Sequence, residues 1–600
     1  MPRIALTVLW IASFAIGGRT ASAAGPELDS QAHRSPIALA ISKDGKRLLT
    51  ANQTSGSVSL VDTTSRKILH ELKTGDRPAG VALSSDGRTA VVSHWFGYDL
   101  AILTVSNDRL AILGRVAVGP EPRGVAISKD GKTAYVAVGV ANEVVRVDLD
   151  KKEVSGRVAV GREPRGLALS PDGARLVVGN SRGRTFSVVS LADFKVERTI
   201  DAVADNIRQV AFDADGKYAY AANMFNRGFA TTKNNIDVGW VLGQRVTKIA
   251  VDGSEPFETL TLDPRGVAAA DAHGLAFSAD GKTLAVSSAG THEVFLFRLD
   301  REPLPWRTSG SRDLMDARLS GNAKAFQRVA TSGRPTELAF SPDGKTLYAA
   351  NYLSDSVQAI DPETATVRDT IALGSPAQIS LVRRGEVLFH DATRSFNQWY
   401  SCNTCHSDGG HTNGLDFDTM NDGWHDYSTS HIRSRKKVPT LRRTAFTKPW
   451  TWHGWQDSLE SATVESFTKS MQGPSPSTDE VKAMVAYLSS LDFPTNPNRA
   501  LDGALTPQAK RGETVFRSAK GACSTCHSGP EFTDAKSTKS AWKSEETFTE
   551  ASIPLRFEAS TTKIPTCTTA DPRPSPKPCP ARTIPKASAE KRSTPPNWPT

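Results

Sequence analysis

The segment Gly119-Pro-Glu-Pro-Arg-Gly-Val-Ala-Ile-Ser-Lys-Asp-Gly131 decides the fold of more than half of this chain, because related segments recur along residues 30 to 375. It is nearly repeated at Gly161–Gly173. Its closing Asp-Gly pair recurs at spacings of 42 to 44 residues, and then of 65 and 63 residues. The pairs are Asp44-Gly45, Asp86-Gly87, Asp130-Gly131, Asp172-Gly173, Asp215-Gly216, Asp280-Gly281 and Asp343-Gly344.

Each Asp-Gly pair lies between two short segments with alternating apolar residues. Around Asp130 these are Val125–Ser128 and Thr133–Val136, and a third follows at Val144–Asp148. Asp-Gly between such segments is typical of a hairpin turn with positive φ. Seven four-stranded units of about 40 residues predict a seven-bladed β-propeller over residues 30–375, and the two-residue period excludes helical repeats. The repeated segment also resembles the YVTN-type propeller family, which implies the same fold.

Two of the seven units are longer than the others. The additional residues fall at about Phe225–Gln244 and Leu304–Ala330. Long loops are more often functional than the elements that they connect. We expect both to contact the C-terminal part of the chain, and the alternative is a pair of insertions without a function.

The residue just before the innermost strand of each unit is expected to face the central channel of the propeller. Three successive units have arginine there and the next has histidine, which predicts an anion site for a carboxylate substrate or a haem propionate. The alternative is that nearby Glu121 and Glu163 neutralise these arginines in a solvated rim. In chain order the seven positions are Ile37, Ala79, Arg123, Arg165, Arg208, His273 and Thr336.

Two pentapeptides in the C-terminal part carry the redox chemistry. Cys402-Asn-Thr-Cys-His406 and Cys523-Ser-Thr-Cys-His527 are both CxxCH sites for covalent attachment of c-type haem. Cys402, Cys405, Cys523 and Cys526 would bond the porphyrin vinyl groups, and each histidine would bind the iron. A zinc site or a redox-active dithiol is the alternative, but zinc needs further ligands at pairing distance and a dithiol needs no histidine. We therefore predict two covalently bound haem c groups.

The segments around the two motifs indicate an internal duplication. Arg-Gly-Glu precedes each motif, in Leu381–Phe389 and in Leu505–Phe516, and Asp479–Leu491 has the periodicity of a closing helix. We predict two tandem all-α cytochrome c folds after the propeller, over residues 381–496 and 503–534, the second one truncated.

This half resembles the bacterial dihaem cytochrome c peroxidase and MauG family, fused here to a propeller. Beside the two CxxCH motifs, the resemblance rests on Val438–Arg442, Trp452-His-Gly454 and Asp457–Glu460. It implies an electron-transfer haem and a peroxide-reactive haem, with His406 and His527 as proximal ligands.

The distal ligands are less defined by this resemblance. Met471 is a candidate for the first haem because thioether ligation suits a high-potential electron-transfer centre. A methionine near a helix is also a common core residue. The competing candidates are His411, His425, His431 and His453, and the last of these follows Trp452 where the family usually has Phe-His-Asp-Gly.

Residues 535–600 are rich in proline, threonine and lysine and predict a disordered tail. The family would have a distal segment here. Pro565–Asp571 can be encoded so that a shifted frame reads Tyr-Leu-His-Asp-Gly-Arg, and Ala551–Ala559 so that it reads Gly-Phe-Asn-Thr-Pro-Ser-Leu-Arg-Gly. Both match that segment, so we interpret the chain from about Ala535 as frameshifted, with Cys567 and Cys579 there by accident.

The N-terminus predicts export. An apolar run over residues 4–16 follows Pro2-Arg3 and precedes the small-residue stretch Thr20–Ala24, which is typical of a secretory signal peptide over residues 1–24. The run is too short to span a bilayer, so we expect a periplasmic protein without a transmembrane segment. The net charge of +9 is modest for 600 residues, and no motif indicates nucleic-acid binding.

Three functions fit these patterns. The first is peroxide reduction with an external electron donor, or a MauG-like oxidation. The second is electron transfer without turnover, in which the propeller docks a small periplasmic donor or acceptor protein. The third is ligand binding or sensing at the propeller, where a small molecule or a protein would bind. No nucleophile and base at catalytic spacing was found in the propeller, so we assign it no chemistry of its own.

Overall fold

The computed structural model describes residues 32–308, 314–376, 378–411, 414–419, 436–451, 454, 456–494, 496, 504–529, 532 and 533. The predicted signal peptide, the tail from Ala535, and His425, His431, Trp452 and His453 lie outside the described residues.

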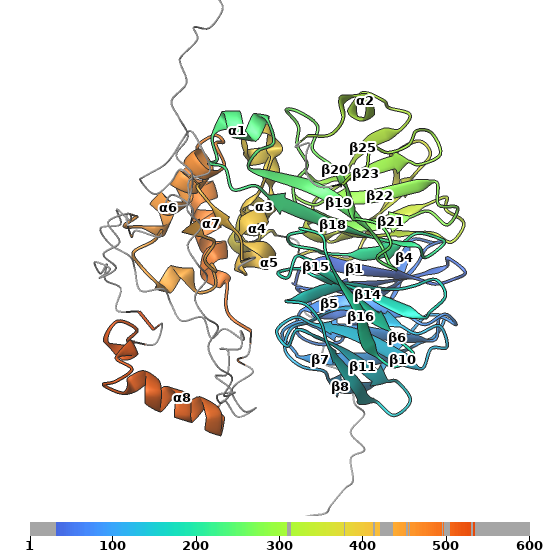
Figure 1. The fold of residues 1–600 in the computed structure, drawn as a ribbon, viewed down its shortest axis with the longest axis horizontal. Coiled ribbons are helices and arrows are strands. Elements are labelled where there is room, and N and C mark those ends of the chain that lie inside the picture. Colours follow the sequence, from blue (N-terminus) through green and yellow to red (C-terminus); the bar gives the residue numbers. More distant parts are fainter. Residues whose placement is uncertain are drawn as a thin grey trace, which may run out of the picture. The chain divides into compact units, whose positions relative to one another are not determined.

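Seven antiparallel sheets follow one another along residues 36–372 and form the blades of the propeller (Figure 1). Blade 1 consists of β1 (Pro36–Ile41), β2 (Arg47–Asn52), β3 (Ser57–Asp62) and β4 (Lys67–Lys73), and blade 2 of β5 (Pro78–Leu83), β6 (Thr89–His94), β7 (Asp99–Val105) and β8 (Leu110–Ala117). Blade 3 consists of β9 (Pro122–Ile127), β10 (Thr133–Val138), β11 (Glu143–Asp148) and β12 (Glu153–Ala159). Blade 4 consists of β13 (Pro164–Leu169), β14 (Arg175–Asn180), β15 (Thr185–Ser190) and β16 (Lys195–Asp201). Blade 5 consists of β17 (Val210–Phe212), β18 (Tyr218–Asn226), β19 (Leu242–Ala250), β20 (Glu258–Thr261) and β24 (Arg307–Thr308). Blade 6 consists of β21 (Ala272–Phe277), β22 (Thr283–Ser288), β23 (Glu293–Arg298) and β25 (Phe326–Ala330). Blade 7 consists of β26 (Pro335–Phe340), β27 (Leu347–Asn351), β28 (Ser356–Asp361) and β29 (Thr366–Ala372).

The seven-bladed prediction is confirmed, with one difference in the fifth blade. That blade has five strands, because the second insertion returns as β24 and pairs with β20 at the outer edge. The predicted turns form at the Asp-Gly pairs. In the third blade, Gly131 has φ of 73°, and the Asp130 carboxylate accepts hydrogen bonds from the Ser128 hydroxyl at 2.5 Å and the Lys132 amide at 3.1 Å.

The ring closes where β26 of the last blade meets β1 of the first. The Thr336 hydroxyl donates to the Pro36 carbonyl at 3.2 Å, and the Glu337 carboxyl accepts from the Leu39 amide at 2.9 Å. The inner strands lie close together because glycine follows the channel-facing residue in several blades. A Cβ on Gly166 would lie 2.5 Å from the carbonyl oxygen of Arg208 in the next blade, so the repeated Arg-Gly pair is a packing requirement.

The helices after the propeller build a small domain around one core. They are α3 (Leu381–His390), α4 (Cys402–Cys405), α5 (Ser407–Gly410), α6 (Leu459–Glu465) and α7 (Thr478–Ser490), with the short strands β30 (Asp416–Phe417) and β31 (Lys436–Lys437). Helices α3 and α7 cross so closely at Gly385 that a Cβ there would overlap the carbonyl of Ala483. The glycine of the first Arg-Gly-Glu motif is therefore a helix-crossing residue.

The first propeller insertion contacts this helical domain, as expected. It contains α1 (Lys233–Asp237), and Ile236, Val241 and Leu242 belong to the same apolar core as the helices. Asn226 also donates to the Asp416 carbonyl at 2.8 Å.

The second insertion does not follow that expectation in its described residues. It contains α2 (Ala317–Ser320), and Leu304, Met315 and Leu319 pack into the core of blades 5 and 6. Its apolar side chains fill the outer edge of two blades, which makes this insertion part of the propeller.

The second haem segment has a different environment from the first. It consists of α8 (Pro507–Arg517) and a short 3₁₀ turn at Cys523–Thr525, and no residue of α8 is buried. A Cβ on Gly512, the counterpart of Gly385, would meet no atom within 4 Å. Within the described residues, the second segment thus lacks the helix crossing of the first, and a complete second cytochrome c fold is not seen there.

Candidate haem site and its contact with the propeller

The first CxxCH motif is held by local bonds and by the propeller. Ser401 caps α4, which carries Cys402 and Cys405, and exchanges hydrogen bonds with Thr404 in a capping box. The Ser401 hydroxyl also donates to the Asp271 carboxylate of blade 6 at 2.6 Å, and the Asn403 amide donates to the same carboxylate at 3.2 Å. The position of the cysteines is therefore fixed by a propeller residue.

The side chain of His406 is prepared for metal binding. Its Nδ1 lies 2.9 Å from the carbonyl oxygen of Pro439, so Nδ1 donates and Nε2 keeps a free lone pair. Burial lowers the pKa of His406 to about 4, so the ring is neutral at physiological pH. The Val438–Arg442 motif quoted above thus supplies the carbonyl that orients this histidine.

Aromatic and apolar side chains enclose the same region. Trp399, Tyr400 and Phe417 are buried in one core with Cys405. Met471 is 1% exposed, and its sulfur lies 3.8 Å from the Cys402 sulfur. The Trp399 indole nitrogen and the Tyr400 hydroxyl are buried, and neither has a hydrogen-bond partner among the described residues.

These residues fit a covalently attached haem. The two thiols, a neutral histidine with a free nitrogen, an apolar wall and two buried donors without partners are what a porphyrin with carboxylate side chains needs. Among the described residues, no three His, Cys, Asp or Glu side chains are grouped as a zinc site would require.

The candidates for the distal position are separated by the fold. Met471 lies beside Cys402 in the enclosed core. His411 faces the propeller instead, with its Nε2 at 3.5 Å from the Glu163 carboxylate of blade 4. His411 is therefore a poor candidate ligand, whereas the geometry keeps Met471 as a candidate.

At the second motif only the local geometry is repeated. Nδ1 of His527 lies 3.1 Å from the carbonyl oxygen of Phe532, just as Nδ1 of His406 lies 2.9 Å from the carbonyl oxygen of Pro439. Cys523 and Cys526 are both half-exposed.

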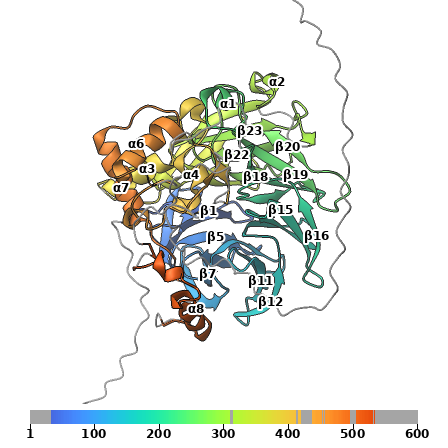
Figure 2. The ribbon, with the colours of Figure 1, turned by 60° about the vertical axis from the view of Figure 1, so that its left-hand side comes forward.

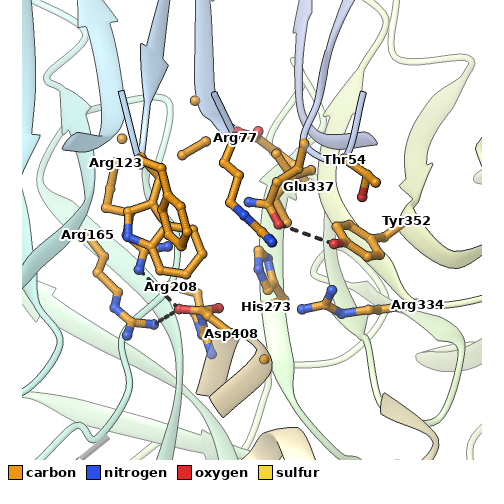
Figure 3. Close-up of a pocket in the computed structure, with 18 of the residues that line it drawn as sticks. Thr54, Arg77, Arg123, Arg165, Arg208, His273, Arg334, Glu337, Tyr352 and Asp408 are labelled. Carbon is orange, nitrogen blue, oxygen red and sulfur yellow. Dashed lines mark hydrogen bonds and ion pairs between the residues drawn. The ribbon is translucent and has the colours of Figure 1, made fainter. Parts of the chain in front are cut away.

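The channel-facing residues gather around a cavity of about 270 Å³ at the axis of the propeller (Figure 3). Of the seven predicted positions, only Thr336 does not line it, because its hydroxyl bonds the Pro36 carbonyl in the ring closure. The other six are Ile37, Ala79, Arg123, Arg165, Arg208 and His273.

A carboxylate of this chain, Asp408, lies between the three arginines (Figure 3). Its oxygens are 2.5 Å from Arg208, 3.0 Å from Arg165 and 3.4 Å from Arg123. Burial would raise the pKa of Asp408, but the three guanidinium groups outweigh burial and hold the pKa well below its usual value. Asp408 has φ of 54°, an uncommon conformation that the surrounding contacts must maintain.

The alternative pairing of the arginines with glutamates also forms, but it is buried and not solvated, because Glu121 is 4% and Glu163 8% exposed. Arg165 lies 2.6 Å from Glu163, and Arg123 lies 3.8 Å from Glu121. Both glutamates and Asp408 therefore neutralise the arginine cluster. Sequence reasoning did not select Asp408, although its place two residues after His406 was a usable signal.

Helix α3 is joined to the propeller by a second buried charge. Arg383 is 2% exposed and lies 3.3 Å from Asp355 of the last blade. It also donates to the carbonyls of Tyr352 at 2.8 Å and Leu353 at 3.0 Å. Figure 2 shows α4 beside β22 of blade 6, the blade that carries Asp271.

The comparison with protein families agrees with this site. Residues 379–493 match the family described as di-haem cytochrome c peroxidase. This part of the chain is a di-haem cytochrome c peroxidase domain. The match ends before the second CxxCH motif, so the family supports covalent haem but does not give the number of haem groups.

The chain is also homologous to hydrazine synthase subunits of Kuenenia stuttgartiensis. It is 34% identical to subunit gamma over 165 residues, covering 26% of this chain and 44% of the relative. It is 30% identical to subunit beta over 189 residues, covering 30% of this chain and 47% of the relative. The matches thus span about half the length of each relative.

One solved structure of the hydrazine synthase from the same organism is similar in fold. It has a TM-score of 0.50 and 27% identity, and the match covers 57% of this chain and 99% of that one. No helix in the described part of the chain is long and apolar enough to cross a membrane.

Proposed function

We propose that this protein is an exported c-type cytochrome that transfers electrons through the haem at Cys402–His406 and reduces peroxide at a second haem. The enclosed first site carries the proposal, because Nδ1 of His406 is held by Pro439 and Met471 is buried beside Cys402. The peroxidase family match over residues 379–493 supports an oxidoreductase.

When bound, haem would supply one-electron redox chemistry at Cys402–His406 and peroxide reduction at Cys523–His527. The residues of the first site serve electron transfer. His406 would hold the iron, Trp399 and Phe417 exclude water, and Asp271 and Asp408 connect the site rigidly to the propeller. A rigid, dry site changes little on oxidation and reduction.

The overall reaction needs an external donor. Two electrons from a small periplasmic donor protein and two protons convert one hydrogen peroxide into two water molecules. The propeller offers a second surface for such a partner or for a substrate.

The reading frame after Asp534 decides whether the second haem has a distal segment. We expect resequencing through codons 528 to 545 to reveal an added or missing base. An unchanged frame would favour electron transfer without peroxide turnover.

The proposed function is tested with holoprotein produced in a periplasm that matures cytochrome c. The haem content per polypeptide is measured first, and two haem groups are expected. Reduced donor and peroxide are then mixed in a stopped-flow instrument. Repeated donor oxidation that depends on peroxide supports the proposal, whereas reduction of a partner protein without peroxide turnover would replace it by pure electron transfer.

A second candidate is nitrogen redox chemistry within a larger assembly. Its specific support is that both matched relatives are subunits of one enzyme, hydrazine synthase. The test is mass-spectrometric detection of hydrazine from ¹⁵N-labelled one-nitrogen compounds and a reduced donor. Absence of labelled hydrazine with the haem-loaded protein would reject this candidate.

A further inference from the structure

A second ring of seven residues surrounds the axis of the propeller. Each of them lies two residues before a channel-facing position in the sequence. All seven have positive φ values between 49° and 58°, so the ring is a repeated feature of the fold. In chain order it consists of Ser35, Arg77, Glu121, Glu163, Asn206, Asp271 and Arg334.

The acidic members of this ring all have partners. Glu121 and Glu163 neutralise Arg123 and Arg165, and Asp271 holds the start of α4. Glu121 and Glu163 are therefore matched by charge, whereas Asp271 is held by two neutral hydrogen-bond donors, Ser401 and Asn403.

The basic members, Arg77 and Arg334, are not matched in this way. No carboxylate of the described residues lies within ion-pair distance of either guanidinium, although Arg334 is only 4% exposed. Arg77 instead lies over the ring of Phe96 at 4.8 Å, and Arg334 over the ring of Tyr352 at 4.3 Å. Burying a cation without a counter-charge is costly, so such a pair on one cavity indicates a missing anion.

The other carboxylates of the cavity are already engaged. Asp408 is shared by three arginines, and Glu386 lies 2.7 Å from Arg383. Asp492 lies 3.4 Å from Arg443. Glu337 accepts from the Leu39 amide and the Gln209 side chain, both at 2.9 Å, and burial raises its pKa to about 8.

The two guanidinium groups belong to blades 2 and 7, which flank blade 1. On this side the cavity is lined by Ile37, Gln53 and Thr54 of blade 1 and by Ala79 of blade 2. In Figure 3 both guanidinium groups point into the cavity. A volume of about 270 Å³ suits a small ligand.

We propose that this cavity binds a small dianion whose oxygens pair with Arg77 and Arg334. The fork geometry of arginine favours oxyanions and carboxylates. A short dicarboxylate and an inorganic dianion share this chemistry. The site is distinct from the haem attachment site, because neither the two cysteines nor His406 lines the cavity.

The experiment is calorimetric titration of the haem-loaded protein with succinate and, separately, with sulfate. Sodium chloride at matched ionic strength is the reference. Saturable binding of either probe is expected, and the stronger one identifies the source of the dianion. If neither binds to the holoprotein, a haem propionate or nothing occupies the cavity, and the proposal is wrong.

Variants distinguish this site from surface binding. Arg334→Gln and Arg77→Gln should each lower the affinity about 10- to 100-fold, as expected for the loss of one charged pair. Arg334→Lys should retain part of the affinity. The matched control is Arg88→Gln, because Arg88 is exposed in the turn after β5 and should leave the affinity unchanged. Unchanged affinity in both Arg77→Gln and Arg334→Gln, with unaltered circular dichroism spectra, would overturn the proposal.

Discussion

Replacing Asp408 with asparagine tests how the haem domain is held on the propeller. The substitution keeps the size of the side chain but removes the charge that Arg123, Arg165 and Arg208 share. Removing one partner of a buried ion pair typically costs about 3–5 kcal/mol. Arg165 keeps Glu163 at 2.6 Å, whereas Arg208 has no other carboxylate within ion-pair distance among the described residues. Because Arg123 and Arg165 keep Glu121 and Glu163 and only Arg208 loses its carboxylate, we expect the low end, about 3 kcal/mol.

Hydrogen exchange of the α4–α5 segment measures this cost directly. A loss of about 3 kcal/mol corresponds to an approximately 100-fold faster exchange of the protected amides of residues 402–411. The matched control is Asp369→Asn, which removes an exposed pair with Arg66 at 2.8 Å and should cost less than about 0.5 kcal/mol.

The sign of the pH dependence follows from the lowered pKa of Asp408. A carboxyl whose pKa is lowered on folding stabilises the protein above its unfolded pKa, near 3.8, and loses this effect only as the pH falls through the folded value. The difference between the wild type and Asp408→Asn should therefore be constant from neutral pH to about pH 4 and shrink below it.

A double-mutant cycle with Arg208→Gln completes the test. The two substitutions together should cost at least about 1 kcal/mol less than the sum of the single ones, because they remove the same contact. The reasoning is refuted if Asp408→Asn behaves like Asp369→Asn, or if the effects of the two substitutions simply add.

Three further predictions follow from the described contacts. Gly385→Ala should destabilise the first haem domain by about 2 kcal/mol or more, because the added Cβ overlaps the carbonyl of Ala483. Gly512→Ala should be neutral or stabilise α8 by up to about 1 kcal/mol. Thermal melts should therefore show a lowered melting temperature for Gly385→Ala and an unchanged or raised one for Gly512→Ala. Met471→Ala should leave the first haem attached but convert it from low spin to high spin in the visible spectrum, and an unchanged spectrum would assign the axial position to another residue. Burial raises the pKa of Glu337 from 4.5 to about 8, so the stability of the wild type should fall as the pH rises from 4.5 to 8. In Glu337→Gln the decrease of the melting temperature with pH should be smaller. Equal decreases in wild type and variant between pH 5 and 9 would contradict the prediction.

The repeated elements of this protein could be predicted from local sequence. An Asp-Gly turn between alternating strands places Gly131 at positive φ, and six of the seven positions predicted beside the innermost strands line the cavity. The fifth strand of blade 5 could not be predicted in this way. It is contributed by an insertion with no repeat to align, and its pairing with β20 depends on the edge that the blade leaves open.

The haem site was predicted in part. Its cysteines and histidines lie within five residues of each other, so their chemistry follows from spacing alone. Pro439 and Asp271 also support the site, yet they lie 33 and 130 residues from His406 and Ser401, the groups they hold. Pro439 falls in the Val438–Arg442 motif, but the motif does not show which histidine its carbonyl binds.

The sequence by itself determined the blades, their turns and the attachment motifs, because each depends on backbone preferences and residue types within a few positions. Only the tertiary structure decided which charges meet. Arg123, Arg165 and Arg208 come from three different blades, and Asp408 is 200 residues or more away from each of them. Closure of the ring brings the arginines together, and docking of α5 places the carboxylate between them. The same closure leaves Arg77 and Arg334 facing a cavity without a carboxylate partner among the described residues, which a list of residues in chain order cannot reveal.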